Sequence, residues 1–343
     1  MRIVAVASVA AMALAGCGSS TTSTPTASGS SNAAKGMKIG MAYDVGGRGD
    51  QSFNDAAAAG LDKAKADLGV VTKEATAVSN EPESAREERL QQLIDAGYTN
   101  VVAVGFAYAP AVKKVAAANP DSKIALIDST DATASNIENL TFAEQQGSFL
   151  VGAAAALKSK TGNIGFIGGV NTDLIKKFEA GYVAGAKKVN PAIKIQVKYL
   201  TQPPDFSGFG DPAKGKTAAE GMYQQGADVV YHAAGGSGGG VFTAAAAAGK
   251  MAIGVDSDQA LTAPPATRKF IITSMLKKVD VATFDFIKSL TSGKFVSGVK
   301  VYDLKANGVG YSTTGGQMDD IKAKLDAYKQ QIIDGTIVVP TKP

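Results

Sequence analysis

Short apolar runs alternate with stretches of helical periodicity along the whole chain after Met37. A short run rich in β-branched residues indicates a buried strand, and apolar residues three or four positions apart indicate an amphipathic helix. This alternation predicts an α/β fold in which a parallel sheet is covered by helices on both faces. The first series of strands and helices reads MKIGMAYD, SFNDAAAAGLDKAKADLG, VVTKEATAV, ESAREERLQQLIDAG, VVAVGF, a helix from about Tyr108 to Asn119, and KIALID.

A second series of the same kind begins near residue 142, so two similar lobes are expected. The segment after residue 270, with a final helix near 317–334, should be shared between them, and the chain should cross several times. We predict residues 37–141 plus about 270–296 in the first lobe and 142–269 plus about 297–343 in the second. The second series reads FAEQQGSFLVGAAAALKSK, NIGFIGG, DLIKKFEAGYVAGAKKVN, IKIQVKYL, KGKTAAEGMYQQG, ADVVYHAAG, VFTAAAAAGK and MAIGVD.

Composition supports a globular protein and narrows its chemistry. The 343 residues are 45% hydrophobic and 19% charged, which is ordinary for a globular chain long enough to bury two cores. A net charge of +4 without any long Lys/Arg tract argues against a nucleic-acid surface. One His and one Cys leave too few side chains for the usual zinc or thiol sites, so we expect no metal and no cofactor.

The first residues have the features of a secretion signal. A basic start at Arg2 precedes an apolar stretch too short to span a bilayer comfortably, and small residues follow before Cys17. The sequence LAGC at 14–17 is similar to the bacterial lipoprotein cleavage motif, which implies removal of residues 1–16 and a lipid on Cys17. A plain signal peptide with an incidental Cys is the alternative. Residues 17–36 are mostly Ser, Thr, Gly and Ala and predict a flexible stalk.

Three of the predicted strands end in an aspartate, at Asp44, Asp128 and Asp256. In open parallel sheets, ligands bind beyond the carboxyl ends of the strands. Carboxylates that meet there suit a ligand with neighbouring hydroxyl groups, because one carboxylate can accept from two of them. Each Asp alone could equally well cap the next turn or helix.

The glycine-rich run after the strand ADVVYHA offers two interpretations. It matches the G-x-S-x-G pattern of a hydrolase nucleophile at Ser237, but the only His, His232, precedes the serine instead of following it. The run also lacks the spacing of a phosphate loop. Gly235 and Gly236 could instead expose backbone N–H groups to a ligand, or form a plain tight turn.

The stretch YDVGGRGDQSFN at 43–54 combines a glycine-rich turn with polar and aromatic residues. It has no phosphate-loop lysine, and its two aspartates would repel a phosphate, so an uncharged ligand is favoured. Ser52 and Asp55 can cap the following helix, while Phe53 can stack on a flat ring. Elsewhere Tyr231 could supply a second ring or belong to the core. Either Lys277 or Lys278 could face a ligand.

Several separated motifs carry a family resemblance. The motifs are Tyr43-Asp44, Gly46-Gly47 and Asp50-Gln51-Ser52-Phe53-Asn54, then IGFIGG at 164–169, FEAGYVAGAK at 178–187, GADVVYHAAGGSGGGV at 226–241, IGVDSDQ at 253–259 and TSMLKKVD at 273–280. With these motifs, the chain from Met37 to near its end resembles the basic membrane protein family of bacterial substrate-binding lipoproteins, which includes purine nucleoside receptors of ABC transporters. Tyr43 stands where that family more often has Phe.

The resemblance implies a type I periplasmic-binding-protein clamshell with three hinge crossings and a purine nucleoside, such as guanosine, inosine or adenosine, between the lobes. The base would lie against Phe53, and Asp256 with the lysine at 277 would hold the ribose. It assigns ligand-binding roles to Asp44, Asp50, Phe53, Asn54, Asp128, Tyr231, Gly235, Gly236, Asp256 and Lys277.

The predicted function is therefore that of a non-enzymatic, monomeric receptor, held by a lipid at the extracytoplasmic face of the cell membrane. It would deliver a nucleoside to an ABC transporter permease and its ATPase. A protein of the same fold that binds a sugar or another small polar solute is the first alternative. A serine hydrolase that uses Ser237 is the second.

Overall fold

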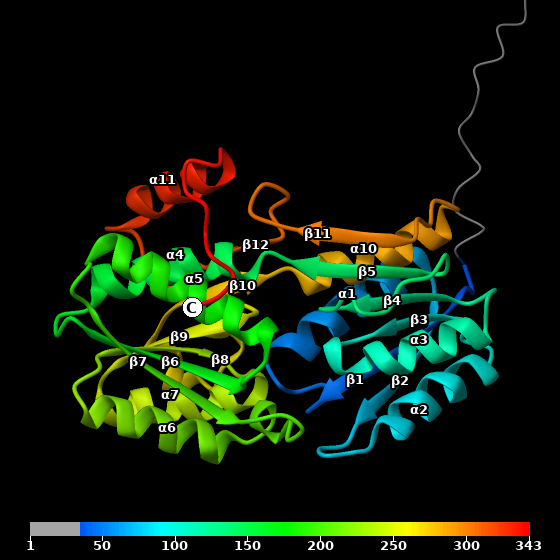
Figure 1. The fold of residues 1–343 in the computed structure, drawn as a ribbon, viewed down its shortest axis with the longest axis horizontal. Helices are drawn as coiled ribbons and strands as arrows, with labels where there is room; N and C mark the ends of the chain where they lie inside the picture. The colour runs from blue at the N-terminus through cyan, green and yellow to red at the C-terminus, as the bar shows by residue number, and fades with distance from the viewer. Residues whose placement is uncertain (1–34) are drawn as a thin grey trace, which may run out of the picture.

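The computed structural model describes residues 35–343, which form two lobes side by side (Figure 1). The predicted signal peptide, Cys17 and nearly all of the predicted stalk lie outside these residues. Each lobe is built on a six-stranded sheet, and helices cover both of its faces. This confirms the α/β prediction. Within the described residues, no helix is both long enough and apolar enough to cross a bilayer.

The sheet of the first lobe is entirely parallel, with the strand order β11-β5-β4-β3-β1-β2. Side chains along β1 alternate between the two faces of this sheet. Ile39 and Met41 pack toward α1 and α10, whereas Ala42 packs toward α2 and α3. Its strands and helices are β1 (Lys38–Val45), α1 (Phe53–Leu68), β2 (Val71–Ala77), α2 (Glu83–Asp95), β3 (Asn100–Ala103), η1 (Phe106–Tyr108), α3 (Ala109–Ala118), β4 (Lys123–Ile127), β5 (Ile137–Phe142), α10 (Val279–Thr291) and β11 (Gly298–Tyr302).

The sheet of the second lobe has the order β12-β10-β9-β8-β6-β7 and is parallel except for β12. Helices α4 and α5 pack together on one face, α6 and α7 on the other, and α11 lies over α4. Its elements are α4 (Glu144–Lys158), β6 (Asn163–Val170), α5 (Asp173–Val189), β7 (Lys194–Thr201), η2 (Ser207–Phe209), α6 (Pro212–Gln224), β8 (Val229–Ala233), η3 (Gly235–Ser237), α7 (Gly238–Ala248), β9 (Met251–Asp256), α8 (Gln259–Thr262), α9 (Pro265–Arg268), β10 (Ile271–Lys277), β12 (Val309–Tyr311) and α11 (Lys322–Ile333).

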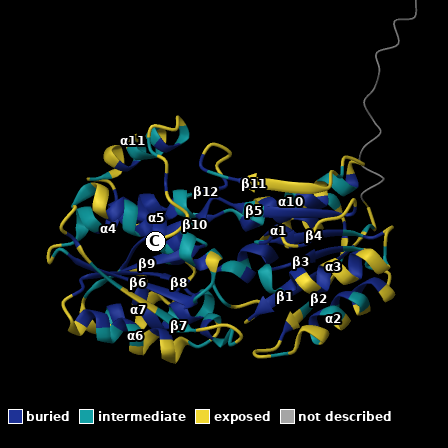
Figure 2. Cartoon of the chain, in the orientation of Figure 1, coloured by how far each residue is buried: buried dark blue, intermediate teal, exposed yellow. Residues whose placement is uncertain are grey.

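The chain passes between the lobes three times: from β5 to α4, from β10 to α10, and from β11 to β12. The predicted lobe boundaries differ from the sheets at two places. Strand β10, predicted in the first lobe, pairs with β9 of the second, and β11, predicted in the second, pairs with β5 of the first. The sequence pattern identifies a strand but not its neighbour, so this pairing could not be predicted. Strand β5 was not predicted either, although most of it is buried (Figure 2).

Helices α4 and α5 approach each other closely because glycines line their contact. A Cβ added to Gly185 would lie 1.9 Å from the carbonyl oxygen of Phe149, and one on Gly181 would lie 2.1 Å from that of Gln145. Only a hydrogen at these positions allows the two backbones to come this close. The close packing fixes the start of α4, which follows the first crossing.

We predict that Gly185→Ala lowers the free energy of unfolding by about 1–3 kcal/mol, because the added methyl overpacks the interface. Gly221→Ala in α6 is the matched control, since an added Cβ there meets nothing within 4 Å. That control should be neutral or stabilising by up to about 1 kcal/mol. Urea unfolding measures both, and equal effects would contradict the packing argument.

Candidate functional site

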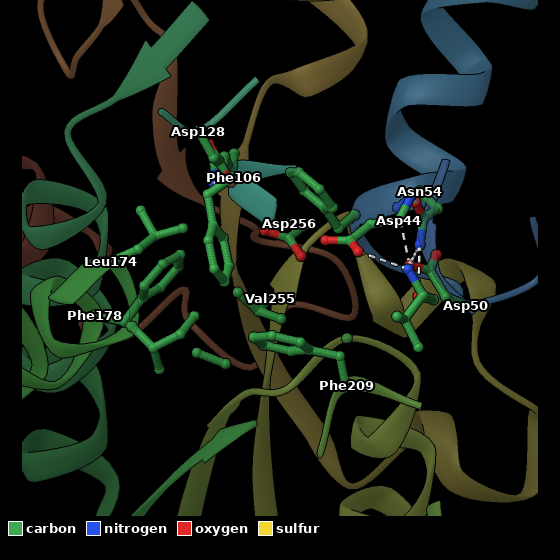
Figure 3. Close-up of a pocket in the computed structure, with 16 residues that line it drawn as sticks. Asp44, Asp50, Asn54, Phe106, Asp128, Leu174, Phe178, Phe209, Val255 and Asp256 are labelled. Carbon is green, nitrogen blue, oxygen red and sulfur yellow. Dashed lines mark hydrogen bonds and ion pairs between the residues drawn. The ribbon is translucent and has the colours of Figure 1, made fainter. Parts of the chain in front are cut away.

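A cavity lies between the carboxyl ends of the two sheets, with an empty volume of about 540 Å³ that includes space open to solvent. The carboxylates of Asp44 and Asp256 face its middle (Figure 3). Of the residues predicted to bind a ligand, those that line the cavity are Asp44, Asp50, Phe53, Asn54, Asp128, Gly235, Asp256 and Lys277.

The three strand-end aspartates meet at this cavity, and each keeps one carboxylate oxygen that accepts no hydrogen bond from residues 35–343. Oδ1 of Asp44 accepts from the N–H of Val45 at 2.8 Å, while Oδ2 is free. Oδ2 of Asp256 accepts from the Ser52 hydroxyl, and Oδ2 of Asp128 pairs with Lys277. Three acceptor atoms are therefore left for a ligand that brings hydrogen-bond donors.

Two of these aspartates adopt strained backbone conformations. The φ angle is +69° at Asp128 and +64° at Asp256, in the left-handed region that non-glycine residues seldom adopt. Such strain costs of the order of 1–3 kcal/mol and concentrates at binding sites. Nearby, Gly105 has φ +106°, and a Cβ there would lie 2.4 Å from Oδ2 of Asp44. The backbone of Gly105 therefore leaves the space that this carboxylate occupies.

Asp50 caps the first helix instead of offering its carboxylate to the cavity. Oδ1 accepts from the N–H groups of Ser52 and Asp55, and Oδ2 accepts from the N–H and the side-chain amide of Asn54. Each polar atom of the Asn54 amide also has a partner, because the amide nitrogen donates to Val45 O and the amide oxygen accepts from the N–H of Asp44. Both residues hold the aspartate at the end of β1 in place.

The predicted helix-capping role of Ser52 is wrong, since its side chain makes no capping hydrogen bond. Its hydroxyl instead donates across the cleft to Oδ2 of Asp256 at 2.6 Å. Two further side chains of the second lobe reach the same turn: Ser257 Oγ donates to Ser52 O at 3.1 Å, and Gln259 Nε2 donates to Gln51 O at 3.0 Å. These contacts hold the lobes closed around the cavity.

Lys277 is the lysine that faces the cavity. It is the last residue of β10, its side chain is only 2% exposed, and its ammonium lies 2.6 Å from Asp128 Oδ2. The rings of Phe53, Phe142 and Phe178 lie 5.1, 4.9 and 5.5 Å from the ammonium. Lys278 takes the N-cap position of α10 and lines a different, hinge-side groove.

Aromatic rings form much of the cavity wall. Phe53 comes from the start of α1, and Phe106 from η1 of the first lobe meets Phe206 and Phe209 of the second at 5.8 and 6.4 Å between ring centroids. Sequence reasoning missed most of these residues, although Phe209 in the glycine-rich run FSGFG was a detectable signal. The lining residues that were not predicted are Val45, Phe106, Leu174, Ile175, Phe178, Phe209, Ala233 and Val255.

Two residues assigned to the ligand do not line the cavity. Tyr231 is fully buried in the core of the second lobe, where it packs on Phe166 and Tyr182, and its hydroxyl lies 3.2 Å from Ser148 Oγ. The prediction that Tyr231 supplies a second aromatic wall of the ligand site is therefore wrong. Side chains alternate along β8, and the ring of Tyr231 points to the face that α4 and α5 cover. Gly236 lies beside Asp50 without lining the cavity, whereas its neighbour Gly235 does.

The geometry around Ser237 does not support a nucleophile. Its buried hydroxyl donates to Gly208 O and accepts from the N–H of Asp211, both at 2.8 Å. His232 Nε2 lies 3.0 Å from Gln259 Oε1, and burial lowers the pKa of this His to about 4. The hydroxyl thus holds the η2 loop against η3, and the histidine supports Gln259.

Burial of several carboxylates dominates the electrostatics of the cavity. Burial raises the pKa of Asp256 to about 7, although Lys277 and the Ser52 hydroxyl partly oppose this. Burial also raises the pKa of Asp44 to about 6 against the Val45 N–H and Arg86. Among the residues that the structure describes, no group of three or more His, Cys, Asp and Glu side chains has the geometry of a metal site.

The raised pKa of Asp256 predicts a pH-dependent stability. Between its ordinary value of 3.8 and about 7, the folded protein binds this proton more tightly than the unfolded chain, so stability falls as the pH rises through this window. Asp256→Asn cannot ionise and should lose less stability between about pH 4 and 7. Urea unfolding over this range tests it, with Asp67→Asn at an exposed carboxylate as control. Parallel profiles for the wild type and Asp256→Asn would contradict the assignment.

Comparison with known proteins agrees with this architecture. The family model described as "ABC transporter substrate-binding protein PnrA-like" matches residues 37–342. A protein of Lactococcus lactis named "ABC transporter nucleoside-binding protein BmpA" is 36% identical over 99% of both chains. The "CD4+ T-cell-stimulating antigen" of Listeria innocua is 35% identical over 96% of this chain and 95% of its own.

A solved structure shows the same arrangement of lobes. The solute-binding protein of an ABC transporter system from Aeropyrum pernix K1 superposes with a TM-score of 0.77 at 32% identity, over 89% of this chain and 94% of that chain. The fold is thus the type I periplasmic-binding-protein fold, as predicted. Together with the match over residues 37–342, this shows that the chain belongs to the basic membrane protein family of ABC transporter substrate-binding proteins.

Proposed function

We propose that the protein captures a purine nucleoside between its lobes and delivers it to an ABC transporter permease without altering it. One observation carries the proposal: three free carboxylate oxygens and one buried ammonium share a cavity with several phenyl rings. Hydroxyl and N–H groups of a nucleoside would donate to the carboxylates, and its flat base would stack on a ring. The name of the Lactococcus lactis relative supports the same ligand class.

The charged side chains of the cavity wall favour an uncharged ligand. Among residues 35–343, the cavity wall carries Asp44, Asp50, Asp128 and Asp256 but only one cation, Lys277, which Asp128 already neutralises. A phosphate group would meet unpaired carboxylates in a site of low dielectric constant, which costs free energy. A nucleoside is therefore favoured over a nucleotide or a sugar phosphate.

The structure changes the roles that we propose for individual residues. Phe53, Asp44, Asp128, Asp256 and Lys277 would contact the ligand, with Asp256 and Lys277 at the ribose. Asp50 and Asn54 have no free hydrogen-bonding atom in the described part of the chain, so we propose that they position Asp44 and the start of α1.

Membrane attachment follows from the N-terminal sequence. We propose that the signal is cleaved before Cys17, that Cys17 carries a lipid, and that residues up to about 36 tether a monomeric receptor to the extracytoplasmic face of the membrane. Attachment of this kind would keep the closed protein near its permease and ATPase.

A ligand screen tests the proposed function. We expect guanosine, inosine or adenosine to raise the thermal unfolding temperature of the protein, because a ligand that binds only the folded state stabilises it. Pentoses, hexoses and nucleoside monophosphates should produce little change. Stabilisation by a sugar, with none by any nucleoside, would favour the sugar-binding alternative. Conversion of the nucleoside into another compound during long incubation would show that the protein is an enzyme.

Phe53→Ala separates a flat ligand from a small polar one. Loss of the ring should weaken nucleoside binding by about 1–3 kcal/mol, the usual contribution of one aromatic side chain stacked on a base. Phe284→Ala is the matched control, because this half-buried ring of α10 lies outside the cavity. Isothermal calorimetry measures both variants, and an unchanged nucleoside affinity in Phe53→Ala would remove this ring from the site.

A further inference from the structure

Glu144 is a buried carboxylate that the roles proposed above do not use. It is the first residue of α4, directly after the first crossing between the lobes, and it is fully inaccessible to solvent. Neither carboxylate oxygen accepts a hydrogen bond from a side chain or backbone group in residues 35–343. Buried carboxylates are rare and costly unless paired, so its surroundings should show what it does.

Two ammonium groups flank this carboxylate. Lys277 Nζ lies 3.3 Å from Oε1, and Lys177 Nζ of α5 lies 3.6 Å from Oε2. With the 2.6 Å pair between Lys277 and Asp128, the charges alternate in one line: Asp128, Lys277, Glu144, Lys177. The line starts at the cavity wall of the first lobe and ends at a partly exposed lysine of the second.

The two carboxylates that contact Lys277 belong to different lobes. Asp128 follows β4 of the first lobe, whereas Glu144 begins α4, which packs on β10 and β12 of the second lobe. Lys277 is itself the last residue of β10. When the lobes separate, the contact with Asp128 is the one that spans the cleft, and the contact with Glu144 stays within one lobe.

We infer that Glu144 is a positioning residue that holds the Lys277 ammonium at the cavity, whether or not the lobes are closed. A long lysine side chain among phenyl rings has many rotamers and a large desolvation cost. A buried carboxylate at 3.3 Å restricts the rotamers and offsets part of the desolvation cost. Although burial alone would lower the pKa of Lys277, the carboxylates of Asp128, Glu144 and Asp256 together raise it above its ordinary value. Glu144 thus presents a charged, oriented donor to the incoming ligand.

This inference rests on the proposed ligand site, and a double-mutant cycle tests it. Calorimetry uses whichever of guanosine, inosine and adenosine binds the wild type most tightly. Glu144→Gln, which keeps the shape and removes the charge, should weaken binding about tenfold, and in a Lys277→Met background it should change affinity by less than about twofold. The matched control is Glu138→Gln, a buried glutamate on β5 outside the cavity, which should stay within about twofold of the wild type. Equal losses in both backgrounds would indicate a merely structural role and overturn the inference.

A measurement without ligand distinguishes failure of this inference from failure of the proposed function. A held, buried ammonium exchanges its protons slowly, so ligand-free protein should show a ¹H–¹⁵N ammonium signal that Lys277→Met removes. Glu144→Gln should broaden or remove this signal, and Glu138→Gln should preserve it. A signal that persists in Glu144→Gln, or is missing from the wild type, would overturn the inference. If no nucleoside binds but the signal depends on Glu144, the proposed function fails and the inference stands.

Should Glu144→Gln fail to fold, Lys177→Met tests the same line of charges from its outer end. Removal of a partly exposed partner should weaken nucleoside binding about two- to threefold through Glu144. Glu144→Asp keeps the charge and should preserve the ammonium signal of Lys277. An unchanged affinity in Lys177→Met, together with loss of the signal in Glu144→Asp, would count against a positioning role.

Discussion

The burial of several carboxylates around the one ammonium of Lys277 is the constraint on which the site depends. Isolated buried charges are too costly to persist, so each must be paired, hydrogen-bonded or partly neutralised. Asp128 and Glu144 pair with Lys277, Asp50 is covered by N–H groups at the start of α1, and Asp256 takes the hydroxyl of Ser52. The strands, turns and hinge segments around the cavity are arranged so that each of these buried charges has a partner.

The same contacts therefore close the two lobes and complete the binding site. The turn at Gln51 and Ser52 belongs to the first lobe, yet its carbonyl groups and hydroxyl bind Ser257, Gln259 and Asp256 of the second. Asp50 caps the helix that starts beside this turn, so the residues that fix the helix also fix the surface that the second lobe docks on. A ligand that donates to the free carboxylate oxygens would lower the cost of bringing like charges together.

The sequence predicts much of this, because hydrophobic periodicity and strand-end position are local properties. The pattern alone identified the two series of strands and helices and placed Asp44, Asp128 and Asp256 at one cleft. It failed where the answer depends on partners distant in the chain. Strand β10 pairs in the other lobe, Tyr231 turns into a core, Ser52 reaches across the cleft, and Glu144 finds Lys277 only after both sheets have formed.

The surplus of negative charge in the cavity also determines which ligands it would favour. An anion would add to the repulsion, and a purely apolar ring would leave three carboxylate oxygens without donors, which costs free energy for each. A guest with a flat ring and several hydroxyl or N–H donors meets both demands, since the phenyl rings cover its faces and the carboxylates accept from its edges. Phenyl rings and carboxylates lie on both lobes, so a ligand with only the flat ring would leave the carboxylates of both lobes without donors. A ligand with only hydroxyl groups would leave the phenyl rings without a flat partner.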